Sequence, residues 1–474
     1  MESLDTVKQR GNSCPTSSSQ SGFHYSMVMA DFNRQFSRSE GQINGKEAII
    51  SVLRAMDDLL ASSLSSLRNL YRRFEPDVWR MAVIQFFTAI GFSICMPFLC
   101  LYFYEDRGLS MTMAGVILLA GGLCAAVTQA LGGALSDRFG RRPVLIVAAS
   151  ASVFLYLGLS VLIGRSAAVW AIAFAYIAGR SVLTTTRPVI SAMVADFTSK
   201  EKLTEAYGII RIGANIGWAA GPAIGGYLAG FLPYGWLFGI PVVTCVIVFF
   251  IAFFFLRESS HRVSMKVGFR SILPPAGDRA FLFFAMASLL LFVVMGQMGS
   301  TLSIFAVDRV GFSTAQYGLL LTLNGLIVIL FQYPMTLAVK RLVKFRALML
   351  GGLFYALGYL SLGWVTQYGW ALGAMAIVTT GEIIVSPVML SVVGELSPED
   401  QRGRYMGFFG LSETIGIAVG PLVGGILLDA FPADLRLVWA PIASIALIAA
   451  MGYYLWARRF ALGPQRAGYK NLAP

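Results

Sequence analysis

Apolar residues in this sequence form long uninterrupted runs that are separated by short polar turns. The 20 residues from Met113 to Gly132 and the 21 residues from Pro143 to Ile163 carry no charged side chain. A helix of about 20 apolar residues is long enough to span the ~30 Å hydrocarbon layer of a bilayer. The pattern predicts twelve such helices, at residues 79–104, 112–133, 143–163, 169–195, 206–230, 236–256, 280–305, 314–338, 346–366, 370–394, 404–429 and 437–457.

Composition and charge support an all-α polytopic membrane protein. Hydrophobic residues make up 56% of the chain and charged residues only 13%, whereas soluble domains contain about 25% charged residues. The net charge of +12 is interpreted as a topology signal, not as affinity for nucleic acid. We expect a monomeric, multi-pass protein of a bacterial-type cytoplasmic membrane, in contact with lipid.

The distribution of lysine and arginine predicts the orientation of the helices. The odd-numbered connections hold only Arg107, Arg165, Arg309 and Arg436, whereas the even-numbered connections hold most of the basic residues. The excess of lysine and arginine marks the cytoplasmic side of a membrane protein. The even-numbered connections and both termini are therefore predicted to be cytoplasmic.

The second half of the sequence repeats the first. Offsets of 199 or 203 residues place like residues together, namely Pro188 with Pro387, Asp196 with Glu395, Gly221-Pro222 with Gly420-Pro421, Gly115 with Gly318, and Gln129 with Gln332. Six helices followed by a copy in the same orientation indicate two parallel repeats, which suit transport around a site near the midplane.

This repeat gives the predicted domain organisation. We expect the N-terminal extension, residues 1–75, to be cytoplasmic and partly disordered. We also expect it to contain an amphipathic helix near 46–74, where apolar residues recur at helical spacing. The other parts are a first six-helix bundle at 76–256, a cytoplasmic linker at 257–279, a second six-helix bundle at 280–460 and a cytoplasmic tail at 461–474.

The connection after the second predicted helix, GALSDRFGRR, concentrates charge between two uncharged runs. Its notable residues are Gly133, Asp137, Arg138, Gly140, Arg141 and Arg142. Gly140 permits a tight turn, and Asp196 is a candidate partner for Arg138 or Arg141. The copy in the second half keeps the basic residues but has Lys340 where Asp137 stands. We predict a cytoplasmic gate in which Asp137 takes part.

Glycines four residues apart predict close helix packing in both halves. Proline within such a helix removes a backbone hydrogen bond and can bend it. The predicted packing motif comprises Gly217, Gly221, Pro222, Gly225 and Gly226 and, in the second half, Gly420, Pro421 and Gly424.

These two motifs resemble those of the major facilitator superfamily. GALSDRFGRR is similar to the signature of its second loop, and GANIGWAAGPAIGG at 213–226 resembles the fifth-helix motif of its twelve-helix proton-coupled drug antiporters. The resemblance implies the major facilitator fold, and a second loop that clasps the two halves together on the inner side when the outer side is open.

Charged residues inside the predicted spans are candidates for function, because each is costly in a bilayer. Arg180 and Arg187 are seven residues apart in the fourth span and share one helix face. Glu382 lies in the tenth span, and the resemblance implies that the fourth and tenth helices line the central cavity. We therefore predict that Glu382 faces these arginines across the cavity and binds the coupling proton. Candidate cavity residues from four other spans are Gln85, Gln129, Gln297 and Gln332.

The sequence favours a secondary active transporter that exports small amphipathic compounds in exchange for protons. One alternative is a transporter of a polar or anionic metabolite, with Arg180 and Arg187 holding the anion. Another is a non-transporting membrane sensor or scaffold. No nucleotide-binding GxxxxGK[ST] stretch, Ser/His/Asp set or metal-ligand cluster occurs in the sequence. We therefore expect no enzymatic activity, cofactor or metal site.

Overall fold

The computed structural model describes residues 71–199, 202–259, 278–398 and 401–461. The chain divides into two units, Met1–Arg73 and Phe74–Pro474, and all elements below belong to the second. Most of the predicted helix near 46–74, most of the predicted linker 257–279 and nearly all of the predicted tail 461–474 lie outside the described residues.

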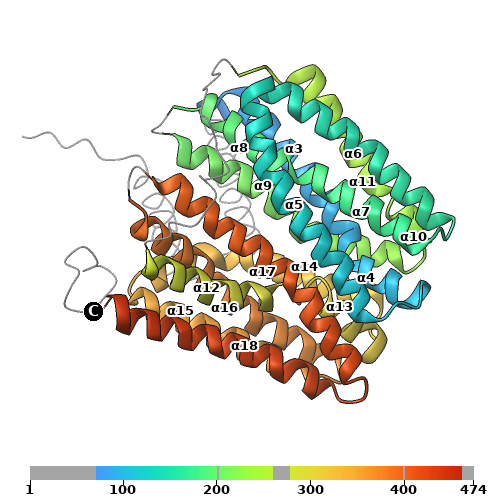
Figure 1. Cartoon of the computed structure of the whole chain (residues 1–474), viewed down its shortest axis with the longest axis vertical. Helices are drawn as coiled ribbons and strands as arrows, with labels where there is room; N and C mark the ends of the chain where they lie inside the picture. The colour runs from blue at the N-terminus through green and yellow to red at the C-terminus, as the bar shows by residue number, and fades with distance from the viewer. Residues whose placement is uncertain (1–70, 200–201, 260–277, 399–400, 462–474) are drawn as a thin grey trace, which may run out of the picture. The chain divides into compact units, whose positions relative to one another are not determined.

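The described part of the second unit is helical throughout, and the helices of its two halves lie side by side (Figure 1). The first half contains α3 (Pro76–Cys95), η1 (Met96–Phe98), α4 (Leu99–Leu101), η2 (Tyr102–Asp106), α5 (Met111–Phe139), α6 (Arg141–Gly164), α7 (Val169–Thr184), α8 (Thr186–Asp196), α9 (Leu203–Ala229), α10 (Tyr234–Leu237), α11 (Ile240–Phe250) and η3 (Ile251–Phe255). The second half contains α12 (Arg279–Met295), α13 (Thr301–Ile304), η5 (Phe305–Arg309), α14 (Thr314–Val339), α15 (Lys344–Leu362), α16 (Tyr368–Leu396), α17 (Arg402–Ala430), α18 (Leu435–Trp456) and η7 (Ala457–Ala461).

Helical segments occur at each of the predicted positions, and nine in the described ranges are long and apolar enough to cross a membrane. The other three predicted positions differ for physical reasons. The fourth is divided into α7 and α8 at Thr185, and the seventh is interrupted after Met295, where α12 ends. The fifth, α9, is long but rich in glycine and interrupted by polar residues.

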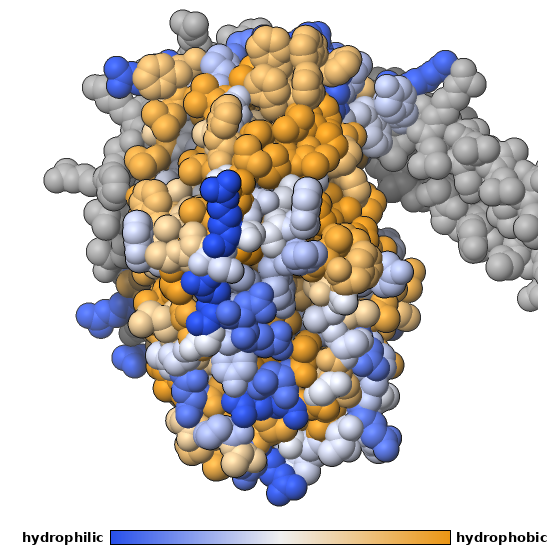
Figure 2. All heavy atoms as spheres, turned by 90° about the vertical axis from the view of Figure 1, so that its right-hand side faces the viewer, coloured by the Kyte–Doolittle hydropathy of each residue, from blue (hydrophilic) through white to orange (hydrophobic). Residues whose placement is uncertain are grey.

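Large apolar side chains cover the outside of the helices. Phe154, Trp170, Phe174 and Trp370 each expose 70% or more of their surface. Figure 2 shows one face on which hydrophobic residues dominate the upper part and hydrophilic residues gather toward the lower part. So much exposed apolar surface is stable only in contact with lipid or another apolar phase.

The predicted glycine stripes pack helices within each half. The stripe on α9 that includes Gly217 lies against α3, and a Cβ at Gly217 would stand 2.8 Å from the backbone nitrogen of Ile90. In the second half, a Cβ at Gly420 would stand 2.7 Å from the carbonyl oxygen of Val293 in α12. A larger side chain at either glycine would therefore force the two helices apart.

The two halves meet along two seams, α5 with α17 and α9 with α14. At the end where α5 begins, backbones touch directly: a Cβ at Gly115 would lie 2.7 Å from the carbonyl oxygen of Pro421, and one at the equivalent Gly318 would lie even closer to the carbonyl oxygen of Pro222. We call this end of the molecule the closed end.

The same seams are loose where α5 ends, which we call the open end. Helical spacing of three and four residues continues the seam faces to Gly133, Gly208 and Gly407. A Cβ at Gly208 or Gly407 would have no described heavy atom within 4 Å, and one at Gly133 would only reach Pro188 of its own half at 3.9 Å. Among the described residues, the two halves are therefore packed less closely at the open end than at the closed end.

Candidate functional site

The segment Gly133–Arg142 lies at the open end and is held by contacts within the first half. Arg141 forms an ion pair with Asp196 at 2.8 Å, and Asp137 lies 3.8 Å from the same guanidinium. The side chains of Arg141 and Asp196 are about one-tenth exposed. Of the two arginines considered as partners of Asp196, the structure selects Arg141, because Arg138 stacks on the ring of Phe139.

This ion pair recurs in the second half. An offset of 203 residues takes Arg141 to Lys344, and Asp196 corresponds to Glu395. Lys344 forms an ion pair with Glu395 and also donates a hydrogen bond of 2.7 Å to Ser391. The ion pair is therefore common to both repeats, whereas Asp137 belongs to the first alone.

Gly140 makes the turn between α5 and α6, and Glu258 covers it. Gly140 has a φ of +96°, a conformation that other residues rarely adopt. One carboxylate oxygen of Glu258 accepts hydrogen bonds from the backbone nitrogens of Arg141 at 3.0 Å and Arg142 at 3.4 Å. The anion thus satisfies the free amides at the start of α6, where negative charge is favoured.

Arg257, beside Glu258, fixes the same stretch of chain to the start of α3. Its side chain donates hydrogen bonds to Asp77 at 2.6 Å and to Glu75 at 2.8 Å. These hydrogen bonds raise the pKa of the Arg257 guanidinium, so it stays charged. The first residues of the predicted linker are therefore part of the first half.

Arg180 and Arg187 lie on two different helices, α7 and α8. The Arg180 guanidinium donates a hydrogen bond of 2.6 Å to the hydroxyl of Tyr176 and lies 5.8 Å from the centre of the Phe92 ring. Arg187 is exposed although it lies inside the predicted fourth span. A charged side chain at this depth needs contact with water or an opposite charge.

Glu382 is half-buried in α16 and is held by a neutral donor from α14. The amide nitrogen of Asn324 donates a hydrogen bond of 2.8 Å to the Glu382 carboxylate and lies 3.0 Å from the hydroxyl of Thr379. The arginine that interacts electrostatically with Glu382 is Arg211 of α9. The prediction that Glu382 faces Arg180 and Arg187 across a cavity stays a prediction.

Two charged residues of this region, Arg211 and Glu413, are absent from the sequence predictions. Both are exposed on the helices of the seams, Arg211 on α9 and Glu413 on α17. Glu413 interacts electrostatically with Arg187 and with Arg211 across the space between the halves. A complete count of charges inside the predicted spans 206–230 and 404–429 would have found them.

The four candidate glutamines have different surroundings. Gln297 is fully buried, and its amide donates to the carbonyl oxygens of Val293 at 3.0 Å and Gly420 at 2.9 Å. It joins α12 to α17, so the prediction that it lines a cavity is wrong.

Gln332 is half-buried and donates a hydrogen bond of 3.0 Å to the carbonyl oxygen of Ile383, which fixes α14 to α16. Gln85 and Gln129 are half-buried and have no hydrogen-bond partner among the described residues. They remain candidates for the space between the halves.

An aspartate of the second half joins the seam at the closed end. The Asp429 carboxylate accepts hydrogen bonds from the backbone nitrogen of Met111 at 3.0 Å, the backbone nitrogen of Thr112 at 2.7 Å and the Thr112 hydroxyl at 2.6 Å. Asp429 at the end of α17 therefore caps the start of α5. The α9–α14 seam has a neutral bond, from the Thr314 hydroxyl to the Gly226 carbonyl at 2.9 Å.

Comparison with known proteins identifies the family. The model of the Major Facilitator Superfamily matches residues 81–401 and 384–472. The chain belongs to the Major Facilitator Superfamily. It is therefore an integral multi-pass membrane protein and a secondary transporter of small molecules, and not an enzyme.

Relatives in the Major Facilitator Superfamily cover most of the chain at low identity. The uncharacterized MFS-type transporter YttB of Bacillus subtilis (strain 168) is 25% identical over 360 residues, which are 75% of this chain and 89% of that protein. The Na(+), Li(+), K(+)/H(+) antiporter of Planococcus maritimus is 24% identical over 372 residues, 71% of this chain and 86% of that protein. The class C tetracycline resistance protein of Escherichia coli is 28% identical over 315 residues, 64% of this chain and 75% of that protein.

Solved structures of the Major Facilitator Superfamily share the fold. A POT family transporter in complex with a thioalcohol conjugated peptide gives a TM-score of 0.68 at 15% identity, covering 81% of this chain and 96% of that one. The nucleoside transporter NupG gives a TM-score of 0.65 at 15% identity, covering 81% of this chain and 99% of that one. At these identities the likeness establishes the fold alone.

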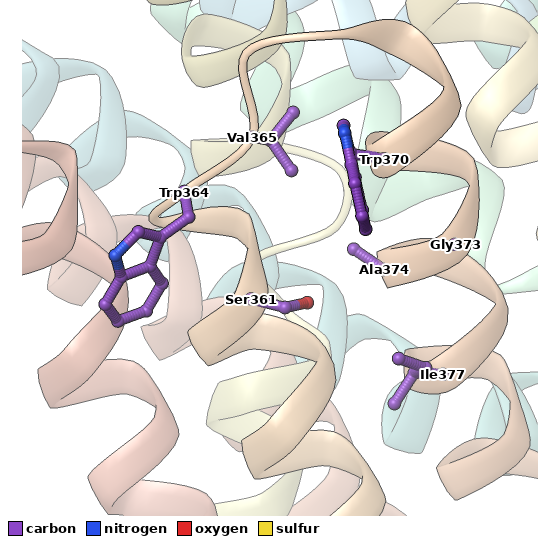
Figure 3. A pocket seen from close by; sticks show the side chains of 7 residues that line it. All are labelled: Ser361, Trp364, Val365, Trp370, Gly373, Ala374 and Ile377. Atoms are coloured by element: carbon purple, nitrogen blue, oxygen red, sulfur yellow. The ribbon is translucent and has the colours of Figure 1, made fainter.

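A separate apolar pocket of about 460 Å³ lies between α15 and α16 of this Major Facilitator Superfamily protein, near their connecting loop (Figure 3). Trp364 and Trp370 stand on opposite sides of it, and Ser361 is its one polar side chain. No charged residue lines it. It has no part in the charged site between the halves.

Replacing Glu258 by alanine is expected to lower the free energy of unfolding by about 1 kcal/mol, because the start of α6 loses its cap. The measurement is the thermal unfolding midpoint of the purified protein in detergent. Glu75→Gln is the matched control, since Glu75 is half-exposed in a surface ion pair with Arg257, and such pairs contribute about 0–1 kcal/mol. Equal midpoints for the Glu258 variant and the unmodified protein would contradict the capping role.

Proposed function

We propose that the chain is a proton-coupled antiporter that exports small amphipathic compounds by alternating access. It crosses a bacterial-type cytoplasmic membrane twelve times as a monomer, with both termini in the cytoplasm. The unequal distribution of lysine and arginine supports this orientation. With it, the open end faces the cytoplasm, which is the side from which an exporter takes its substrate.

The Gly133–Arg142 segment is the proposed inner gate. In this conformation its described ion pairs stay within the first half, as expected for a gate whose two sides have separated. When the halves rock to close the open end, the segment meets the second half. The buried pair of Arg141 and Asp196 keeps it rigid during that motion.

The contact between Glu382 and Asn324 carries the proposal for proton coupling. The Glu382 carboxylate accepts a hydrogen bond of 2.8 Å from an amide. Among the described residues, no arginine or lysine nitrogen lies within 4 Å of it. Glu382 can therefore gain or lose a proton without breaking an ion pair. Neutralising it removes a charge from the middle of the membrane, which eases the transition between conformations. The antiporter and resistance proteins among the relatives are consistent with such exchange.

Replacement of Glu382 by glutamine is expected to abolish proton movement linked to transport, because glutamine keeps the hydrogen bond but cannot ionise. The measurement uses the full chain in proteoliposomes with an imposed pH gradient and a panel of dyes, drugs and organic anions. A compound that dissipates the gradient through the unmodified protein is tested on the variant. Glu75→Gln at the surface is the control, and unchanged coupling in Glu382→Gln would remove Glu382 from the mechanism.

A transporter of an anionic metabolite is the second candidate, and the exposed Arg187 favours it. Arginine binds carboxylate and phosphate groups through two parallel hydrogen bonds. Organic anions in the same panel distinguish the two candidates. If only anions are transported, organic anions and not amphipathic drugs are the substrate class.

A further inference from the structure

The two halves contribute charges of opposite sign to the predicted spans. In the described helices, the central charged residues of the first half are arginines, namely Arg180 on α7, Arg187 on α8 and Arg211 on α9. Those of the second half are glutamates, Glu382 on α16 and Glu413 on α17. One side of the space between the halves is therefore positive and the other negative.

These charges face one accessible space without closing on one another. Arg187, Arg211 and Glu413 are all exposed, although they lie on helices within the membrane. Glu413 interacts electrostatically with both arginines, yet no nitrogen–oxygen pair among the three is within 4 Å. Lipid contact at this depth would be costly for each charge, so the separated charges border a water-accessible site.

Aromatic side chains adjoin the positive side of the site. Arg180 stacks over Phe92, whose ring lies 5.6 Å from that of Trp218 in an edge-to-face arrangement. Trp218 is 40% exposed. An apolar surface next to the arginines suits a ligand whose anionic group is attached to an aromatic or aliphatic body.

The charge balance discriminates among ligands. The arginines attract an anion but the glutamates repel it. The glutamates attract a cation but the arginines repel it. A ligand that carries both charges satisfies both sides at once, with a carboxylate on the planar guanidinium groups and a cationic group on the carboxylates. Repulsion of the wrong charge is an effective source of specificity.

From this arrangement we infer that the site selects amphoteric small molecules, with their anionic group on Arg187 and Arg211 and their cationic group on Glu413 and Glu382. The inference rests on the proposed transport function and names its substrate class. A cationic group on the carboxylates also takes the place of a proton there, which links substrate binding to proton release.

Three fluorescent probes that differ only in charge test the inference. Nε-dansyl-lysine carries both charges, its methyl ester only the cation, and its Nα-acetyl derivative only the anion. Binding is measured by dansyl fluorescence with the full chain in nanodiscs. The amphoteric probe is expected to bind at least about 10-fold more tightly than either relative, since each lost hydrogen bond to a charged group has at least this effect.

Variants assign the two ends of the probe. Arg187→Gln with Arg211→Gln is expected to reduce the affinity for the amphoteric probe to that of the ester, and Glu413→Gln to that of the acetyl derivative. Arg346→Gln is the matched control, because Arg346 is exposed at the start of α15, outside the site. Arg187→Lys and Glu413→Asp keep the charges and are expected to keep the tighter binding of the amphoteric probe. This result would show that the losses in the other variants come from the missing charges and not from misfolding.

Several outcomes would overturn the inference. Equal affinity for the three probes, tighter binding of a singly charged probe, or no binding of any probe at 1 mM (about 4 kcal/mol of binding free energy) each contradicts it. Proton exchange with another compound alongside such a result would refute the substrate class and leave the proposed function intact. Charge-selective binding without any proton exchange would refute the coupling alone.

Discussion

Replacing Asp429 by asparagine is expected to favour opening of the α5–α17 seam at the closed end. The equilibrium constant for this opening is expected to rise by at least about 10-fold. The Asp429 carboxylate accepts three hydrogen bonds from Met111 and Thr112, across the interface between the halves. Hydrogen bonds to a charged group contribute about 1.5–3 kcal/mol, and 1.4 kcal/mol is a factor of ten. Asparagine keeps the shape but loses the charge.

The opening is measured by alkylation of a cysteine placed at Ala418, which is 2% exposed and packs on Gly122. The five native cysteines are first replaced, so that the new thiol alone reacts. Asp434→Asn is the matched control, because Asp434 caps α18 at the same end but within the second half, with 2.9 Å to the nitrogen of Arg436. Alkylation of Asp429→Asn at the rate of this control would contradict the role of Asp429.

The second large effect is expected at the ion pair of the inner gate. Arg141→Gln leaves Asp196 as a nearly buried charge without its partner, and breaking a buried ion pair on one side destabilises a protein by about 3–5 kcal/mol. The thermal unfolding midpoint of the purified protein in detergent is expected to fall by several degrees. The double variant Arg141→Gln with Asp196→Asn is expected to recover part of the loss, because no charge then remains buried.

The equivalent pair in the second half is the control for this prediction. Side-chain exposure is 22% for Lys344 and 36% for Glu395, so water screens the pair more strongly. Lys344→Gln is expected to lower stability by no more than about 1 kcal/mol. Equal losses for Arg141→Gln and Lys344→Gln would show that burial does not distinguish the two repeats.

The fold could be predicted because its signals are long and redundant. Runs of about 20 apolar residues, a repeat offset near 200 residues and the lysine and arginine distribution all agree. The position of Asp196 at the cytoplasmic end of the fourth predicted span also indicated that it lies near the arginines of the second loop. The breaks in α7–α8 at Thr185 and after Met295 have no such signal, because apolar composition does not distinguish a continuous helix from a broken one.

The site was less predictable, because its residues come together only in three dimensions. Gln297 is a polar residue in a span, as Gln129 is, but the carbonyl oxygen of Gly420 in a distant helix satisfies it. Glu258 and Asp429 act on the first amides of helices that lie far away in the sequence, and periodicity carries no information on such pairs.

The different bonds at the two seams of the closed end have a mechanical consequence. Gly230 occupies the position equivalent to Asp429, so the α9–α14 seam lacks this carboxylate contact. The donors to Asp429 are two backbone amides and a hydroxyl, all neutral. The bonds from Thr112 are exposed. Water can solvate the freed Asp429 carboxylate when the α5–α17 seam opens, whereas the bond from Thr314 to Gly226 is partly buried. The α5–α17 seam is therefore expected to open first, while the α9–α14 seam keeps the halves aligned.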